Sequence, residues 1–249
     1  MKIEILQHPD NTYRTQEQAI LFHNQRNEPM LSFPNCWDIV KENNTEAIKA
    51  IRGDCNERWL YLSTQIEYST TNLSGTIIHN AGSNTAKQKK IYVKEIPDYT
   101  AKKLPDVLDE EAGLQYVRAL IDKPKATKEQ IIKFFETLSG KKAEKVRFWT
   151  PTQSSRKERP VRSVGLYFCD FDRFVVYGAD WLDGYSGLSR GVKVKSAKQT
   201  EFLSSKAIFD IVERKITIPL ENKYRKQIEI SLKKNKVSKI KWELKIKIQ

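Results

Sequence analysis

Four aspartates in residues 164–186 are the side chains of this sequence best suited to hold a metal ion. Asp170 and Asp172 are two residues apart, so on a strand both would project from one face. Asp180 and Asp183 follow in a glycine-rich segment. Mg²⁺ binds one or two carboxylates together with phosphate oxygens, and the ion can activate water for phosphodiester cleavage. The pattern therefore predicts a Mg²⁺-dependent endonuclease of the restriction or homing type, with Asp170 and Asp172 as catalytic residues and all four aspartates as metal ligands.

A simpler interpretation of the same aspartates stays open. The segment DFDR stands between two apolar runs, where Asp is favoured in a hairpin turn because its side chain bonds nearby backbone. A restriction-type site would also need Glu/Asp-x-Lys on a strand. Three Glu-x-Lys triplets begin at Glu213, Glu221 and Glu243, but lysine is so frequent here that such triplets arise by chance. None of them is assigned a catalytic role.

Basic segments carry the stronger functional signal. Arginine in a serine-containing loop suits phosphate contacts and can also read base edges. Three segments are predicted to contact nucleic acid, through Lys87, Lys89 and Lys90; through Arg156, Lys157, Arg159 and Arg162; and through Arg190, Lys193 and Lys195. Lysine-rich faces also keep many domains soluble, so the arginine-dense segment 156–162 is the most specific of the three.

Aromatic residues repeatedly follow arginine in strand-like segments. ERWLYL, VRFWTP and DRFVVYG share this pattern, although three short echoes are too few for a repeat architecture. Trp37, Trp149, Trp181 and Tyr185 lie near proline, glycine or basic residues. If exposed, such rings could stack on unpaired bases, and otherwise they belong to the core.

The net charge of +13 is unevenly distributed along the 249 residues. Residues 123–163 hold 12 Lys/Arg against 4 Asp/Glu, and residues 187–249 hold 17 against 6. A basic surface is typical of a polyanion partner, because each cation that neutralises a phosphate releases counterions. The leading hypothesis is a nucleic-acid-binding protein, with DNA favoured over RNA. The alternatives are the endonuclease, with Mg²⁺ as its cofactor, and a non-catalytic subunit of a nucleoprotein complex with protein partners at residues 1–97.

Several classes of protein are disfavoured. No apolar run approaches the length of a membrane span, and the N-terminus lacks the pattern of a secretory signal, so no membrane partner is expected. The three cysteines are widely spaced, which suits a reducing cytoplasm. Walker, Rossmann and serine-hydrolase motifs do not occur. We therefore expect a cytoplasmic protein.

Hydrophobic patterning predicts an α+β fold with a mixed, mainly antiparallel sheet and several helices. Strands are expected at residues 2–6, 58–69, 76–80, 90–96, 146–150 and in VGLYFCDF and RFVVYG, and helices at 15–24, 44–52, 109–121, 127–138 and 200–213. Residues 151–163 are predicted to be a polar basic loop. Strict alternation predicts a half-buried strand at 240–248.

A linker is predicted at residues 97–106, which contain two prolines. It would separate an N-terminal mixed α/β region, residues 1–97, from a basic α+β domain, residues 106–249. One continuous domain is the alternative.

Overall fold

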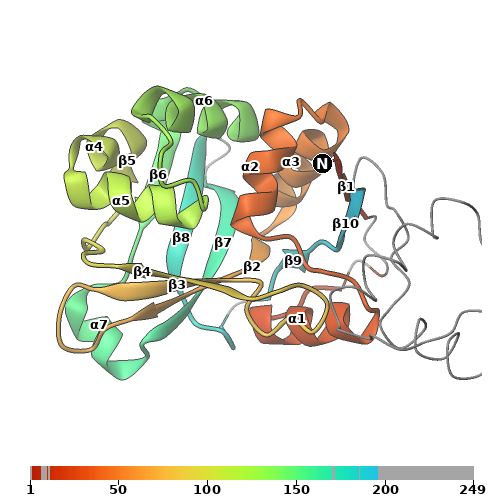
Figure 1. Cartoon of the computed structure of the whole chain (residues 1–249), viewed down its shortest axis with the longest axis horizontal. Coiled ribbons are helices and arrows are strands. Elements are labelled where there is room, and N and C mark those ends of the chain that lie inside the picture. The colour runs from red at the N-terminus through yellow and green to blue at the C-terminus, as the bar shows by residue number, and fades with distance from the viewer. Residues whose placement is uncertain (1, 7–9, 11, 170–171, 185, 196–249) are drawn as a thin grey trace, which may run out of the picture. The chain divides into compact units, whose positions relative to one another are not determined.

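One curled sheet organises the part of the chain that the structure describes (Figure 1). The computed structural model describes residues 2–6, 10, 12–169, 172–184 and 186–195, all within the compact unit Met1–Lys195. The strand order is β4-β3-β2-β7-β8-β6-β5, with β9 beside β2. These strands are β2 (Leu60–Tyr68), β3 (Gly75–His79), β4 (Lys89–Val93), β5 (Lys102–Lys103), β6 (Val146–Trp149), β7 (Val161–Cys169), β8 (Arg173–Asp180) and β9 (Leu188–Ser189).

Most helices cover one face of this sheet. They are α2 (Phe33–Lys41), α3 (Thr45–Glu57), α4 (Leu104–Asp109), α5 (Glu111–Leu120) and α6 (Lys128–Ser139). All five contribute to one apolar cluster with inward residues of the sheet such as Phe148, Leu166 and Phe174. The predicted α+β class with a mixed, mainly antiparallel sheet is confirmed. None of the described helices is long and apolar enough to cross a membrane.

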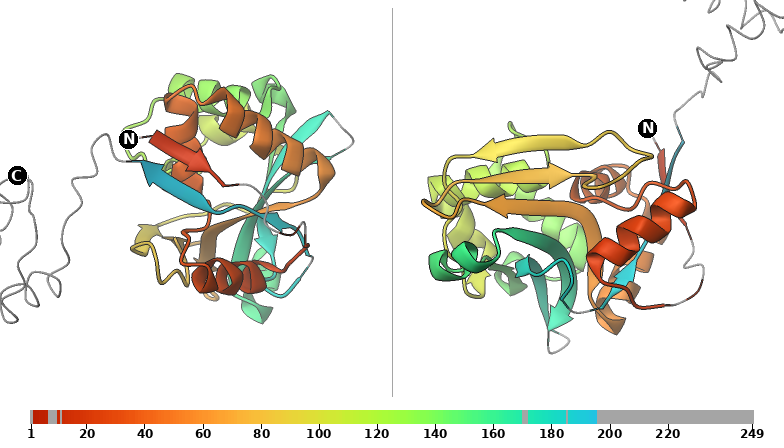
Figure 2. Two further views of the ribbon diagram at one scale, coloured as in Figure 1. Left: turned by 90° about the vertical axis from the view of Figure 1, so that its right-hand side faces the viewer. Right: turned by 90° about the horizontal axis from the view of Figure 1, so that it is seen from below.

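Two elements lie apart from this layer. Helix α1 (Gln16–Gln25) packs Ala19 and Ile20 on Tyr61 in a second, smaller cluster that Trp59 borders. Strand β1 (Lys2–Ile5) pairs antiparallel with β10 (Val192–Lys195), as Figure 2 shows.

Local signals explain where helices begin and end. Thr127 accepts a hydrogen bond from the amide of Gln130 at 3.3 Å, and the Gln130 side chain accepts one from the Thr127 amide at 3.0 Å, as the sequence predicts for α6. Gly140 ends α6 in a left-handed conformation with φ of 70°. The Arg52 guanidinium then donates to the last carbonyls, those of Thr137 and Leu138, at 2.6 and 3.0 Å.

Some elements differ from the sequence prediction. Helix α2 was not predicted. Its Pro34 lies in the first turn, where proline is favoured because the amide there has no partner within the helix. The predicted helix 109–121 corresponds to α5, and the short helix α4 before it was not predicted. The predicted loop 151–163 was wrong in part, since it holds helix α7 (Gln153–Glu158) and the start of β7. The Thr152 side chain caps α7 by accepting from the Ser155 amide at 3.5 Å.

The proposed linker lies inside a continuous fold. Residues 97–106 include β5 and the start of α4, and residues from both sides of this segment, such as Ile66 and Phe148, belong to one apolar cluster. The predicted helix 200–213 and strand 240–248 lie outside the described residues.

Candidate nucleic-acid interface

The aspartates do not converge on one site. Asp172 lies in the turn between β7 and β8, where Lys145 Nζ approaches its carboxylate at 2.5 Å and Lys141 Nζ at 3.9 Å. These lysines hold the pKa of Asp172 below its usual value. Asp180 and Asp183 lie at the other end of β8, roughly 25 Å away at the usual rise of a strand.

This separation corrects the predicted set of four metal ligands, because one ion cannot bridge the two ends of β8. Asp170 lies outside the described residues. Asp183 is held by Arg159, whose Nη1 donates to it at 2.7 Å. Asp180 is 7% exposed and accepts hydrogen bonds from the Tyr61 hydroxyl and, at 2.9 Å, from the Trp181 amide. Burial raises the pKa of Asp180.

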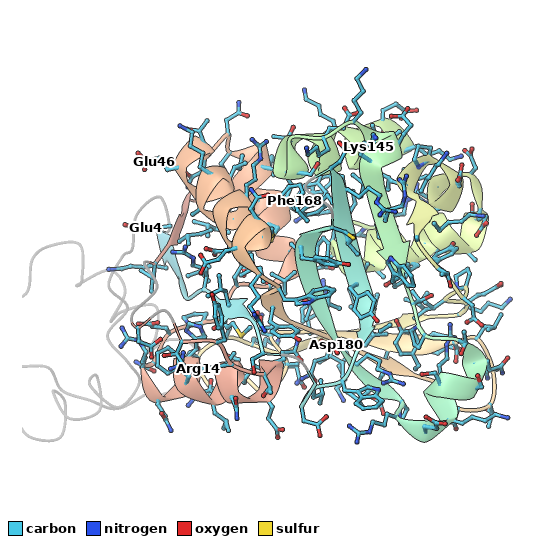
Figure 3. All side chains as sticks on the ribbon, turned by 180° about the vertical axis from the view of Figure 1, so that it is seen from behind. Glu4, Arg14, Glu46, Lys145, Phe168 and Asp180 are labelled. Carbon is cyan, nitrogen blue, oxygen red and sulfur yellow. The ribbon has the colours of Figure 1, made fainter. Side chains whose placement is uncertain are left out.

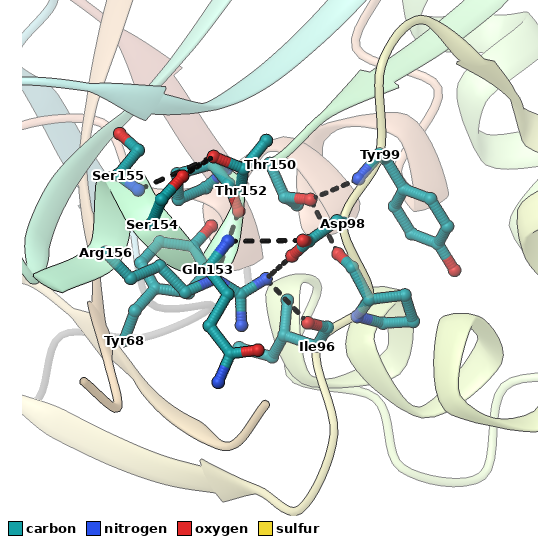
Figure 4. A network of polar contacts seen from close by, with 12 residues as sticks. Tyr68, Ile96, Asp98, Tyr99, Thr150, Thr152, Gln153, Ser154, Ser155 and Arg156 are labelled. Carbon is teal, nitrogen blue, oxygen red and sulfur yellow. Dashed lines mark hydrogen bonds and ion pairs between the residues drawn. The ribbon is translucent and has the colours of Figure 1, made fainter. Parts of the chain in front are cut away.

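Two arginines expected at the surface are fully buried. Arg156 donates to Pro151 O, Ile96 O and the Asp98 carboxylate at 3.0, 2.8 and 2.6 Å, and its guanidinium lies over the Tyr68 ring (Figure 4). Arg162 donates to the carbonyl and hydroxyl oxygens of Ser155. Both side chains have 0% exposure, so a surface phosphate cannot reach them in this structure. The prediction that these two arginines contact nucleic-acid phosphates is therefore corrected. Their side chains join α7 to the sheet instead.

The other predicted basic residues are dispersed. Arg190 forms a bidentate pair with the buried Asp54 at 2.7 and 2.6 Å, which anchors the chain before β10. Lys89 pairs with Asp122 at 2.6 Å. Exposed positions remain at Lys87, Lys90, Lys157, Arg159 and Lys193, whereas the Lys195 side chain lies outside the described residues. Figure 1 shows α7 and the β1–β10 pair on opposite sides of the described unit, so Lys157 and Lys193, which lie on these elements, share no surface.

A set of aromatic residues does converge, on the sheet face opposite helices α2–α6. Directly paired residues point to the same side of a sheet. The register pairs Trp149 with Tyr177, Tyr177 with Gly165, and Val175 with Tyr167. The neighbouring residues in these strands, including Phe148, Leu166 and Phe174, point into the main core instead. In Figure 3, seen from behind, no helix lies in front of β6, β7 and β8.

The rings form a continuous row. The Trp59 ring lies 3.8 Å from that of Tyr167 and 5.1 Å from that of Tyr177, and the Tyr177 ring lies 6.1 Å from that of Trp149, measured between centroids. All four side chains are half-buried. Gly165 makes this packing possible, because a Cβ there would lie 3.1 Å from the Trp59 ring.

Cations border the row. The register places Arg147 beside Val175, Lys103 beside Arg147, and Arg173 beside Cys169, all on the same side as the rings. On this side of β5, β6 and β7, and of β8 as far as Tyr177, the register places no acidic residue. The pairing of β7 with β8 becomes irregular beyond that point, at Gly178–Asp180. We call this surface, formed by Trp59, Trp149, Tyr167, Tyr177, Lys103, Arg147 and Arg173, the aromatic face.

Trp181 lies just beyond Asp180, at the end of β8. It is 44% exposed, and the Arg159 guanidinium stacks on its ring at 4.1 Å from the centroid. Of the tryptophans considered for stacking, Trp149 thus belongs to the aromatic face and Trp181 is exposed beyond the end of β8. Trp37 packs on the main core against Phe134, and Tyr185 lies outside the described residues.

Sequence reasoning did not assemble the aromatic face, although a signal was present. The three Arg–aromatic segments supply Trp59, Arg147, Trp149, Arg173 and Tyr177. What could not be predicted was the register, in particular the parallel pairing of β6 with β8 that aligns Trp149 with Tyr177.

Comparisons of this chain with protein-family models, with curated protein sequences and with solved structures gave no match. The function is therefore inferred from the geometry of the site.

Proposed function

We propose that this protein binds single-stranded nucleic acid, with unpaired bases stacked on the aromatic face and phosphates held by the cations around it. One observation supports this most: the register gathers Trp149, Tyr177 and Tyr167 beside Arg147 and Arg173. The carboxylate nearest along β8, that of Asp180, is buried and bonded to the Tyr61 hydroxyl. A row of rings on an open sheet is a surface on which bases of any sequence can stack.

The open aromatic face favours single-stranded over double-stranded nucleic acid. All four rings are partly exposed on the open sheet, and a base that stacks on one of them must present its flat side. Bases in a duplex are stacked on each other and expose only their edges. We therefore expect single strands to bind more tightly than duplexes.

This proposal keeps the nucleic-acid hypothesis from the sequence but moves the contact from the basic loops to the sheet. The endonuclease hypothesis required the aspartates in one site, and Asp172 is separated from Asp180 and Asp183 by the length of β8. That arrangement gives no reason to assign cleavage.

Binding can be measured by fluorescence anisotropy with labelled oligo-dT, oligo-U and a duplex of equal length. Loss of one stacking ring costs about 1–3 kcal/mol, roughly 5- to 150-fold in Kd. We expect this loss for Tyr177→Ala and retention of most affinity for Tyr177→Phe. Tyr92→Ala is the matched control, because Tyr92 is 68% exposed on β4, outside the aromatic face.

Comparison of the dT and U oligonucleotides decides between DNA and RNA. Equal binding of the duplex, or a Tyr177→Ala affinity equal to that of Tyr92→Ala in folded protein, would contradict the proposal.

A further inference from the structure

Strand β4 is an edge of the sheet and has a free side. It pairs antiparallel with β3, from Gly75 opposite Val93 to His79 opposite Lys89. Within the described residues no strand pairs with its other side. An edge strand presents a row of backbone N–H and C=O groups to which another extended chain can bond.

A groove lies between β4 and helix α5, and Figure 1 shows these two elements next to each other. Its volume is about 730 Å³. Ile91 and Val93 line it from the strand, and Ala112 and Ala119 line it from the helix. Ala112 and Ala119 are seven residues apart, so they lie on one side of α5. Their small side chains leave room for the side chains of an added strand.

The two ends of the groove carry opposite charge. At one end lie Lys89 and Arg118 with the single carboxylate of Asp122. At the other end lie Glu95 and Glu111 with the single cation Lys94. A peptide antiparallel to β4 would place its N-terminal part near the acidic end and its C-terminal part near the basic end.

The lysines on β4 restrict what can bind. Lys89 and Lys90 begin the strand and Lys94 follows it, and lysine on an edge opposes indiscriminate pairing. A binding segment therefore needs charges complementary to both ends of the groove, in addition to backbone hydrogen bonds with β4.

We propose that an extended segment of a partner protein adds as a strand to β4, with alternate apolar side chains in the groove against α5. This segment has a basic residue toward Glu95 and Glu111 and an acidic residue toward Arg118. The site is separate from the aromatic face, so the proposal does not depend on nucleic-acid binding.

The test uses the full chain and fluorescein-labelled peptides of the pattern Lys-Thr-x-Thr-x-Thr-Glu, with x as Val, Leu, Phe or Tyr, so that Lys, both x residues and Glu share the side that faces α5. We expect at least one peptide to bind more tightly than roughly 1 mM in anisotropy measurements. Replacing two of the threonines by proline, which removes backbone donors, should reduce binding at least about tenfold, as should exchange of the terminal Lys and Glu.

Two variants locate the binding. Ala112→Phe fills the groove and should weaken binding at least about tenfold, whereas Lys49→Phe adds the same ring to an exposed position on α3 and should not. The proposal is overturned if no peptide of the panel binds, or if Ala112→Phe and the proline peptide bind normally. Sedimentation that shows a dimer dissociated by Ala112→Phe would place a second copy of the chain in the groove, and would also overturn it.

Discussion

At the scale of residues, burial decides what each charged side chain can do. Arg156 and Arg162 have the same chemistry and both are fully buried, but their surroundings differ. Arg156 reaches Asp98 and two backbone carbonyls. Arg162 has no carboxylate within ion-pair distance among the described residues, and its Nε and Nη1 lack hydrogen-bond partners there. Burial accordingly lowers the pKa of Arg162.

This difference predicts responses of different size to the same substitution. Arg156→Met removes three hydrogen bonds and should lower the free energy of unfolding by about 3 kcal/mol. Arg162→Met replaces a poorly satisfied buried cation and should change it by less than about 1 kcal/mol. Urea unfolding of both variants checks this, and equal destabilisation would show that the two arginines are equivalent.

His79 provides a pH-dependent prediction. Its Nε2 donates to Ala119 O at 3.0 Å, and its Nδ1 lies 3.2 Å from Thr64 Oγ1, which accepts from the Phe33 amide. Burial lowers the pKa of His79 below 6.5, so the unfolded chain binds the proton more tightly. The stabilisation is present above about pH 6.5 and is lost as the pH falls toward the pKa of the folded state.

We therefore expect the unfolding free energy of the wild type to decline between about pH 7.5 and pH 5.5. In His79→Gln the decline should be smaller, with the remainder due partly to His23, whose pKa burial also lowers. An unchanged pH profile in the variant would show that His79 does not titrate differently on folding.

At the scale of elements, Gly165 controls the shape of the aromatic face. A Cβ at this position would lie 3.1 Å from Trp59 Cε3 and 3.6 Å from Tyr61 Cδ1, so Gly165→Ala should displace the Trp59 ring. We expect a loss of about 1–3 kcal/mol in stability and weaker binding of oligo-dT.

Gly53→Ala is the matched control, since a Cβ there has nothing within 4 Å. In the interior of α3 it should stabilise by about 1 kcal/mol and leave binding unchanged. Equal oligonucleotide affinity of the two variants would contradict the role of Trp59 packing.

Most elements followed from local sequence, whereas the site did not. The capping box at Thr127 and the apolar period behind it are local signals, and α6 was predicted almost to its ends. Burial of Arg156 and alignment of Trp149 with Tyr177 depend on residues far apart in the chain. Serine and arginine in residues 154–162 look the same in sequence whether they face solvent or the core.

At the scale of the whole molecule, the net charge of +13 suggests more phosphate contacts than the aromatic face can make. The described cations are spread over opposite sides and many are paired within the protein, as Arg190 is with Asp54. The aromatic face has three, Lys103, Arg147 and Arg173. On single strands, log Kd changes with log salt by about 0.7 per phosphate, so a slope of about 2 is expected.

Titration of oligo-dT at several salt concentrations tests this estimate. Arg147→Gln should reduce the slope by about 0.7, and Lys157→Gln, on α7, should not. A slope several times larger, reduced equally by both substitutions, would indicate binding by the dispersed cations instead.

Photocrosslinking tests nucleic-acid binding at the aromatic face most directly. Oligonucleotides that carry iodouridine, irradiated with the full chain and mapped by mass spectrometry, join to aromatic side chains on which the base stacks. We predict adducts at Trp59, Trp149, Tyr167 or Tyr177, abolished by excess unlabelled single strand. Adducts confined to the basic segments 87–90, 156–159 or 190–195, with none on these four rings, would contradict it.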